Sequence, residues 1–339
     1  MRLVMILLPG FLVLVSTASV FFASTPQEVE PSPTEKAVRF LSREVPRWRA
    51  EHDCYSCHNN GDAARALYLA LEKNYTVPDE ALRTTNDWLA QPERWDDNGG
   101  NGVFDDRTLA RIQFANALLS AQEAGLGGDR DALLRAGDLV AANQSEDGSW
   151  RLDASSSIGS PATYGRFLST WAARRVLLAA SAERFRSAIE AADRWLRRAE
   201  VKTVLDAAAV VQALGLADDA EAMAQRRHCL DLIVAGKAPS GGWGPYVTSA
   251  AEPFDTAVVL LALMSLSERP ELAQPSLGET GLHEAIRSGR MFLVERQLPD
   301  GSWPETTRPA GQVSYAQYIS TSGWATLALL VAEGREEAR

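Results

Sequence analysis

From about residue 35 onward, apolar residues recur three and four positions apart, which is the spacing of one helix face. Alternating apolar and polar positions, which are typical of a half-buried strand, are scarce. The Ala-rich stretches 205–214 and 257–266 are apolar on almost every side, as helices are when other helices surround them. The pattern therefore predicts an all-α chain that contains deeply buried helices.

A short loop recurs between these helices. Residues 144–150 and 297–303 share the pattern Q-x-x-D-G-S-W, residues 240–243 read S-G-G-W, and Trp95 is followed by D-D-N-G-G. Asp-Gly and Gly-Gly supply the tight turn that ends a helix. We expect the loop tryptophans to be structural, packed between neighbouring repeats, and the loop glutamines to bond helix-end carbonyls.

The spacing of the loop tryptophans indicates how many repeats the chain contains. Trp95, Trp150, Trp243 and Trp303 are 55, 93 and 60 residues apart. The longest interval has room for two repeats, and one more helix pair precedes Trp95. The first helix pair is expected at about 34–50 and 61–74, and the following hairpins at about 80–123, 130–180, 183–215, 219–266 and 282–333. Six hairpins predict an α/α toroid, with first helices outside and second helices inside, as one domain over 35–333.

The loop resembles that of the prenyltransferase and squalene-oxidase repeat group, which includes squalene–hopene cyclases and the β subunits of protein prenyltransferases. The resemblance covers roughly residues 80–333. It implies a terpenoid cyclase-like toroid, similar to the C-terminal domain of squalene–hopene cyclase. It implies less about activity, because one fold supports many functions.

A second motif bears on that activity. The resemblance places D-x-D-D-T-A at the start of an inner helix, where the middle Asp protonates a polyene. Residues 252–257 here read E-P-F-D-T-A, so Phe254 stands at the proton donor's position. Because Phe has no acidic proton, classical terpene cyclisation is not expected. Glu252 and Asp255 are the remaining candidates for a catalytic acid in a divergent cyclase-like enzyme.

Two of the three cysteines, Cys54 and Cys57, precede His58 in the pattern C-x-x-C-H, the attachment sequence for c-type haem. The two thiols can form thioethers to the haem vinyl groups, and the adjacent His58 can reach the iron. The motif falls in the turn of the first hairpin, so we expect the haem at the loop-bearing rim of the ring. A disulfide or redox pair, or a zinc site that includes His52, are alternatives.

The sequence does not choose a sixth iron ligand, and an open position is an equal alternative. The candidates are His52, His283, Met223, Met264 and Met291.

Two further groups of residues fall near the starts of the inner helices. Four acids are expected to cap these helices, with a functional ring of acids as the alternative: Asp62, Asp106, Asp206 and Asp255. Seven aromatic residues are expected to pack in the core or to line a pocket for an apolar ligand: Tyr164, Trp171, Tyr246, Phe254, Tyr315, Tyr318 and Trp324.

The composition and the N-terminal segment bear on the partners and the localisation of the protein. The 339 residues hold 34 basic and 44 acidic side chains, a net charge of −10, which argues against a nucleic-acid partner. After Met1-Arg2, residues 3–23 carry no charge, so residues 1–24 are expected to be a signal peptide or a membrane anchor. A Pro-rich linker follows over 25–34. We therefore expect export to the periplasm, either free or anchored at the outer face of the inner membrane.

The combined expectation is an exported toroid that carries one covalent haem for electron transfer, redox sensing or haem-assisted chemistry. A redox partner or an apolar small molecule would be its partner. The alternatives are a haem-free binding module for an isoprenoid, lipid or peptide, or a divergent cyclase-like enzyme.

Overall fold

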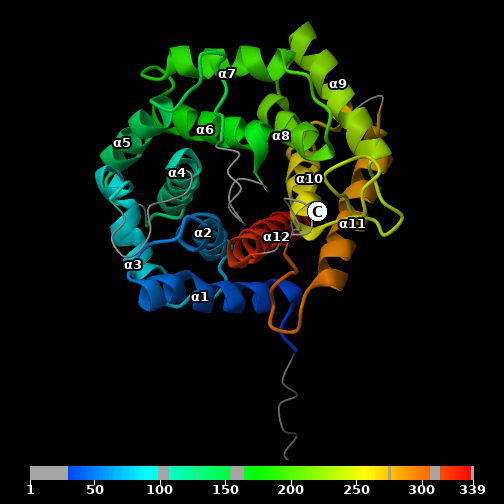
Figure 1. The fold of residues 1–339 in the computed structure, drawn as a ribbon. Helices are drawn as coiled ribbons and strands as arrows, with labels where there is room; N and C mark the ends of the chain where they lie inside the picture. Colours follow the sequence, from blue (N-terminus) through cyan, green and yellow to red (C-terminus); the bar gives the residue numbers. More distant parts are fainter. Residues whose placement is uncertain are drawn as a thin grey trace, which may run out of the picture. The chain divides into compact units, whose positions relative to one another are not determined.

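The computed structural model describes residues 30–97, 107–126, 128–152, 164–273, 276–305 and 314–336. The chain divides into Met1–Pro31 and a compact unit, Ser32–Arg339. In the described part of that unit, twelve α-helices form two concentric rings (Figure 1). The outer ring consists of α1 (Pro33–His52), α3 (Asp79–Leu89), α5 (Arg130–Ala141), α7 (Arg186–Arg198), α9 (Ala220–Ala235) and α11 (Gly278–Arg296). The inner ring consists of α2 (Ala64–Glu72), α4 (Arg107–Glu123), α6 (Gly165–Ser181), α8 (Val204–Leu214), α10 (Pro253–Ser265) and α12 (Tyr315–Glu336).

Outer and inner helices alternate along the chain, so each successive pair is one hairpin and the expected α/α toroid is confirmed. Short helical turns η1 (His58–Ala63), η2 (Pro92–Arg94) and η3 (Pro270–Ala273) lie between them. The ring closes where α12 packs against α1, η1 and α2. None of the helices within the described ranges is long and apolar enough to cross a membrane, and the segment 1–24 lies outside those ranges.

Trp150, Trp243 and Trp303 hold their hairpins together in the same way. The indole Nε1 of Trp150 donates to the carbonyl of Val140 at 2.7 Å, ten residues earlier at the end of the outer helix. Trp243 and Trp303 repeat this bond with carbonyls ten residues before them, also at 2.7 Å. All three indoles are at most 1% exposed. The structural role expected for these tryptophans is therefore confirmed.

The loop glutamines connect one repeat to the next. Gln144 Nε2 donates to Gly148 within its own turn and to Ala188 in the first turn of α7. Gln297 Nε2 likewise donates to Gly301 and to Pro33, the first residue of α1. One acceptor of each glutamine thus lies in its own turn and the other at the start of the neighbouring outer helix, which corrects the expectation of helix-end carbonyls. The last of these bonds closes the ring.

The helix starts differ from the expectation for the four acids. Ser32 caps α1 in a capping box with Glu35, so α1 begins at Pro33, inside the expected linker. Thr203 caps α8, and Asp206 lies in its first turn. Asp255 lies in the first turn of α10 after Glu252, whose side chain makes no capping bond. Asp106 lies outside the described residues.

Candidate functional site

His58 begins η1, a π-helical turn that continues directly into α2. The C-x-x-C-H motif therefore leads into an inner helix, and its histidine is buried rather than held in an open loop at the rim. The turn is packed closely from two sides, because an added Cβ at Gly61 would lie 2.9 Å from Gln113 Cβ on α4. On the other side, a Cβ at Gly323 of α12 would lie 3.0 Å from the Asp62 backbone. Such close approach fixes the position of η1 against the inner ring.

The His58 ring is held by the last helix of the chain. Its Nδ1 lies 2.8 Å from Ser320 Oγ, and the Ser320 hydroxyl donates to Asp62 Oδ2 at 2.6 Å. A serine hydroxyl has one proton, so when it donates to Asp62 its oxygen can only accept from His58. Nδ1 then carries the ring proton, and the lone pair of the imidazole is on Nε2. Burial lowers the pKa of His58 to about 4, so the ring is neutral near pH 7.

Asp62 is the acceptor at the centre of this cluster. Besides Ser320, it accepts from Gln113 Nε2 at 2.7 Å and from the Tyr164 hydroxyl at 3.0 Å. Burial raises the pKa of Asp62, and the three side-chain donors and Arg65 oppose that rise. The expected capping role for Asp62 is wrong. Its side chain is bound by other side chains, and its amide bonds Cys57 within a continuous helix.

The two cysteines of the motif lie in the turn between α1 and η1, and neither is in a disulfide bond among the described residues. Cys54 is buried and accepts a hydrogen bond from Trp48 Nε1 at 3.3 Å. Cys57 is partly buried and is close enough to the Tyr164 phenol to contribute to its raised pKa, which is caused chiefly by burial. Within the described ranges, no three His, Cys, Asp or Glu side chains are grouped as metal ligands would be.

Four of the seven aromatic residues from the sequence gather in the ring interior. The Trp324 ring centroid lies 5.8 Å from Tyr164, 6.0 Å from Trp171 and 5.8 Å from Phe254. Since Tyr164 also donates to Asp62, this aromatic cluster adjoins the polar cluster.

The other three aromatic residues lie elsewhere. Tyr315 stacks on Trp48 with centroids 5.4 Å apart, close to the cysteine turn. Tyr318 bonds Ser302 in the last loop at 2.6 Å. Tyr246 is 55% exposed in the loop before α10, so the structure does not bring it into the interior cluster.

The acids considered for cyclase chemistry are both at the start of α10. Asp255 is fully buried, and Glu252 has a buried Oε2 without a hydrogen-bond partner among the described residues. Asp62 is a further carboxyl beside the aromatic cluster, because Tyr164 of that cluster donates to it. The sequence offered one signal for it, the four-residue spacing from His58, which places both residues on one helix face.

The proposed sixth ligands are scattered. His52 ends α1, two residues before Cys54, and stacks on Trp48 with centroids 4.0 Å apart. Met223, His283 and Met291 belong to the outer helices α9 and α11, and Met264 is buried in α10. Of these five, His52 is therefore the one that the fold places beside the cysteine turn.

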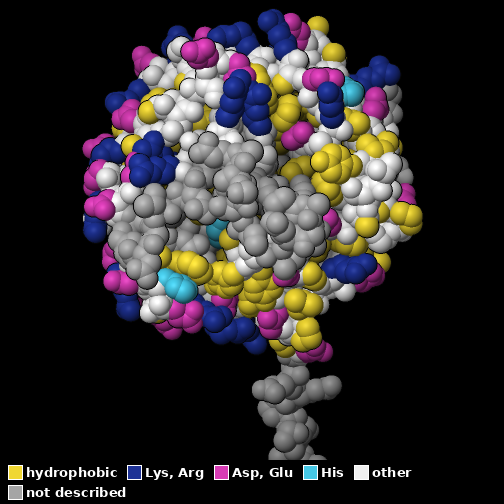
Figure 2. Space-filling view, in the orientation of Figure 1, with side chains coloured by type: hydrophobic (Ala, Val, Ile, Leu, Met, Phe, Trp, Pro, Cys, Tyr) yellow, Lys and Arg dark blue, Asp and Glu magenta, His cyan; other side chains and the backbone are white. Residues whose placement is uncertain are grey.

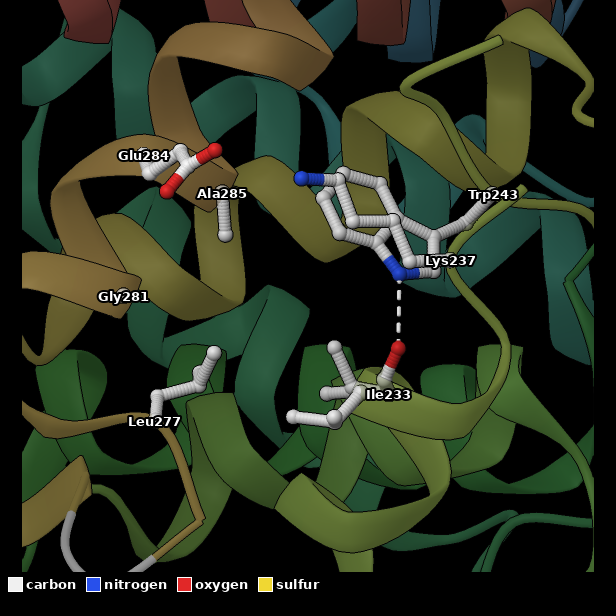
Figure 3. A pocket seen from close by; sticks show the side chains of 8 residues that line it. Ile233, Lys237, Trp243, Leu277, Gly281, Glu284 and Ala285 are labelled. Atoms are coloured by element: carbon white, nitrogen blue, oxygen red, sulfur yellow. Dashed lines mark hydrogen bonds between the residues drawn. The ribbon is translucent and has the colours of Figure 1, made fainter. Parts of the chain in front are cut away.

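A separate pocket of about 220 Å³ opens on the outer wall between α9 and α11 (Figure 3). Ile233 and Leu277 lie on opposite sides of it, with Trp243, Lys237 and Glu284 among the other lining residues. None of the sequence candidates for catalysis or haem attachment lines this pocket. On the face that Figure 2 shows, acidic and basic side chains are interspersed along the periphery of the molecule.

Comparison with known proteins supports the architecture. Neither a protein-family model nor a curated protein matches the chain. Among solved structures, the apo type II terpene cyclase MstE from Scytonema is 15% identical, with a TM-score of 0.55 over 90% of this chain and 99% of that one. A polysaccharide lyase is 13% identical, with a TM-score of 0.56 over 91% of this chain and 99% of that one.

A third structure is described as a possible member of the GH105 family from Klebsiella pneumoniae. It is 12% identical, with a TM-score of 0.52 over 97% of this chain and all of that one. At such low identity these likenesses establish the terpenoid cyclase-like α/α toroid fold and leave the activity open.

Proposed function

We propose that this chain is an exported toroid protein that carries one covalently attached c-type haem. Cys54 and Cys57 would form the two thioethers, and His58 would bind the iron. A haem supplies a one-electron centre, so the protein would serve electron transfer, redox sensing or haem-assisted chemistry on a molecule held by the ring. The observation that carries the proposal is the hydrogen bond between His58 Nδ1 and Ser320, which leaves the other ring nitrogen, Nε2, for the iron.

The His58 side chain meets two requirements of an iron ligand. It is neutral near pH 7, because burial lowers its pKa to about 4. Its Nδ1 is engaged by Ser320, which leaves the Nε2 lone pair available to a metal.

Ser320 and Asp62 would position that ligand. When Asp62 is ionised, the chain of bonds from His58 through Ser320 to Asp62 draws the Nδ1 proton away from the ring. The ring then becomes a stronger electron donor at Nε2. Gln113 and Tyr164 fix the carboxylate so that it faces Ser320.

The thiols also suit attachment. Thioether formation adds a thiol S–H across a vinyl group, so that sulfur bonds one vinyl carbon and the proton goes to the other, with no oxidant required. Neither cysteine is in a disulfide bond among the described residues, as this addition requires. The N-terminal segment supports the same proposal, because covalent haem attachment in bacteria takes place outside the cytoplasm.

Intact mass measurement tests this proposal. The protein is expressed with its N-terminal segment in a host that has the haem-attachment machinery, and the mature chain is weighed under denaturing conditions. We expect a mass increased by one haem, located by digestion to the peptide that contains Cys54 and Cys57. Loss of the added mass in Cys54→Ser/Cys57→Ser is the matched control. A folded, exported wild-type chain of unmodified mass would contradict the proposal.

A second candidate function rests on the aromatic cluster around Trp324. Four aromatic rings in the interior of a terpenoid cyclase-like toroid favour a module that holds an isoprenoid, lipid or other apolar molecule. Mass spectrometry of lipids that copurify with the protein tests this function. Cyclic products from squalene or shorter polyprenes, lost on Asp255→Asn or Asp62→Asn, would instead indicate a divergent cyclase.

A further inference from the structure

Arg65 is a buried cation in the ring interior. It lies on α2 three residues after Asp62, and its side chain is almost wholly enclosed, with the residue 7% exposed. Its guanidinium carbon is 4.8 Å from the centroid of the Trp324 ring and 5.6 Å from that of Trp171. Its Nη1 has no hydrogen-bond partner among the described residues. A buried guanidinium nitrogen without an acceptor is costly, because it has lost water and gained nothing in exchange.

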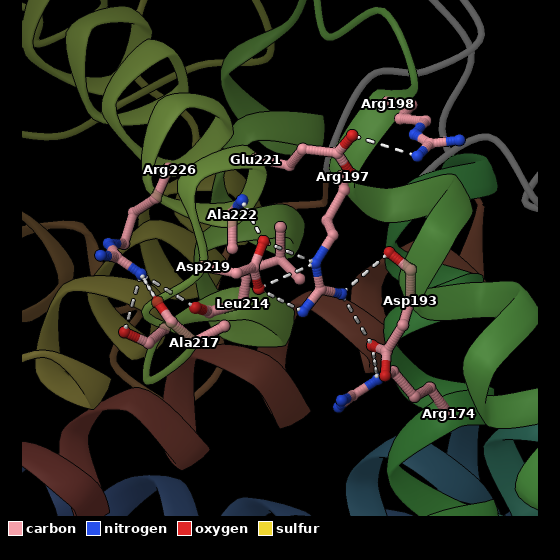
Figure 4. Close-up of polar contacts among 11 residues, drawn as sticks. Arg174, Asp193, Arg197, Arg198, Leu214, Ala217, Asp219, Glu221, Ala222 and Arg226 are labelled. Atoms are coloured by element: carbon pink, nitrogen blue, oxygen red, sulfur yellow. Dashed lines mark hydrogen bonds and ion pairs between the residues drawn. The ribbon is translucent and has the colours of Figure 1, made fainter.

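Arg226 shows how the same fold satisfies a buried arginine. It is 3% exposed, and its Nη1 donates to the carbonyls of Leu214, Gly215 and Ala217 at 3.1, 3.3 and 2.7 Å (Figure 4). These carbonyls lie at and after the end of α8, where backbone acceptors are otherwise unpaired. Arg65 lies within the continuous helix of η1 and α2, and its Nη1 donates to no carbonyl of the described residues. Compared with Arg226, Arg65 therefore lacks a hydrogen-bond acceptor for its Nη1 among the described residues.

No carboxylate in the described part of the chain supplies this acceptor. The oxygens of Asp62 accept from Ser320, Gln113 and Tyr164, and no ion pair within 4 Å joins Asp62 to Arg65 there. Burial lowers the pKa of Arg65 to about 10, which still leaves it cationic near pH 7. The interior therefore presents a positive charge with an unused donor, flanked by indole faces.

We propose that Arg65 forms an anion-binding subsite in the ring interior, which takes the carboxylate or phosphate group of a ligand whose apolar part packs against Trp171 and Trp324. An incoming carboxylate or phosphate oxygen accepts from Nη1 and neutralises the guanidinium, as charge-assisted hydrogen bonds do. The indoles shield that pair from water and supply the apolar contact. Two sources offer this chemistry, a diffusible amphiphilic acid and a propionate of the proposed haem. The subsite itself does not depend on the haem.

The test uses dodecanoate as the probe, below the concentration at which it forms micelles, with dodecanol as its neutral counterpart. Isothermal titration is carried out on the haem-free Cys54→Ser/Cys57→Ser protein and on the protein as isolated from the haem-attaching host. We expect dodecanoate to bind the haem-free protein at least tenfold more tightly than dodecanol does. Dodecanoate binding that is lost only in the haem-loaded protein identifies a propionate as the natural occupant. Equal binding to both forms identifies a diffusible acid.

Substitutions of Arg65 connect the binding to this residue. Arg65→Gln should weaken dodecanoate binding at least tenfold, Arg65→Lys should retain most of it, and Arg198→Gln on the outer wall should leave it unchanged. Removal of an uncompensated buried charge should also raise the melting temperature of ligand-free Arg65→Gln, which separates lost binding from lost folding. The proposal is overturned if folded haem-free protein does not bind dodecanoate, or if Arg65→Gln binds it as tightly as its parent.

Discussion

His58 Nδ1 and Ser320 Oγ lie 2.8 Å apart, although 262 positions separate the two residues in the chain. The bond joins the first hairpin to the last, at the point where the ring closes. It also determines the tautomer of the imidazole, in which Nδ1 carries the proton and Nε2 carries the lone pair. Ring closure and the orientation of His58, the proposed iron ligand, therefore depend on the same contact.

Substitution of Ser320 should change the electronic properties of the proposed haem. Ser320→Ala removes the link between His58 and Asp62, so the imidazole becomes a weaker donor and the oxidised iron is less stabilised. We expect the reduction potential of the haem to rise, measured by a spectroscopic redox titration. Ser320→Thr keeps the hydroxyl and should restore the parent value. Ser42→Ala, which removes a hydroxyl bonded to Val38 on α1, is the control. An unchanged potential in Ser320→Ala would show that the serine serves packing alone.

Asp62 should give the haem-free protein a specific dependence of stability on pH. Burial raises its pKa above the unfolded value, so the unfolded chain releases this proton first as pH rises. Ionisation then favours the unfolded state, and Asp62 contributes less stability at higher pH. The free energy of unfolding of the parent relative to Asp62→Asn should therefore fall from about pH 4 upward, until the folded protein also ionises. Urea denaturation at a series of pH values measures this difference. A difference that grows with pH would mean that the hydrogen bonds outweigh burial.

Ring closure can be tested at a turn glycine. Gly301 has φ of 97°, and a Cβ there would lie 2.2 Å from the carbonyl oxygen of Lys36 on α1. Gly125 has a similar φ of 77° with nothing within 4 Å of its Cβ position. Gly125→Ala should cost about 1–2 kcal/mol, the penalty for the left-handed conformation. Gly301→Ala should cost at least about 3 kcal/mol, because crowding adds to that penalty. Equal losses in urea denaturation would exclude the close approach of the last loop to α1.

The ring could be predicted from the sequence because its repeated interactions are local. Trp150, Trp243 and Trp303 each bond a carbonyl ten residues earlier, so the spacing of tryptophan and glycine in the loops predicts these hairpins directly. The C-x-x-C-H motif was equally visible, since its chemistry lies in five consecutive residues. Both patterns can be recognised in the sequence because the residues that form them are close together in the chain.

The polar cluster could not be predicted in the same way. Asp62 resembled a helix cap because it precedes an Ala-rich helix, yet η1 extends that helix backward to His58 through a π-helical turn. Nothing in the local pattern around Ser320 marks which hydroxyl on α12 faces η1. Arg65 was missed for a related reason, because an arginine on an amphipathic helix is normally a surface residue. Its burial follows from the packing of α2 against α4 and α12.

The most direct test of the haem proposal is the visible spectrum of the denatured protein in alkaline pyridine, after expression in a host that attaches haem. We predict the reduced spectrum of a haem whose two vinyl groups have been converted to thioethers, with one haem per chain. It should shift toward that of a haem with one free vinyl group in Cys54→Ser or Cys57→Ser alone. It should disappear when both cysteines are replaced. A folded and exported wild-type protein without this spectrum would contradict covalent haem attachment at Cys54 and Cys57.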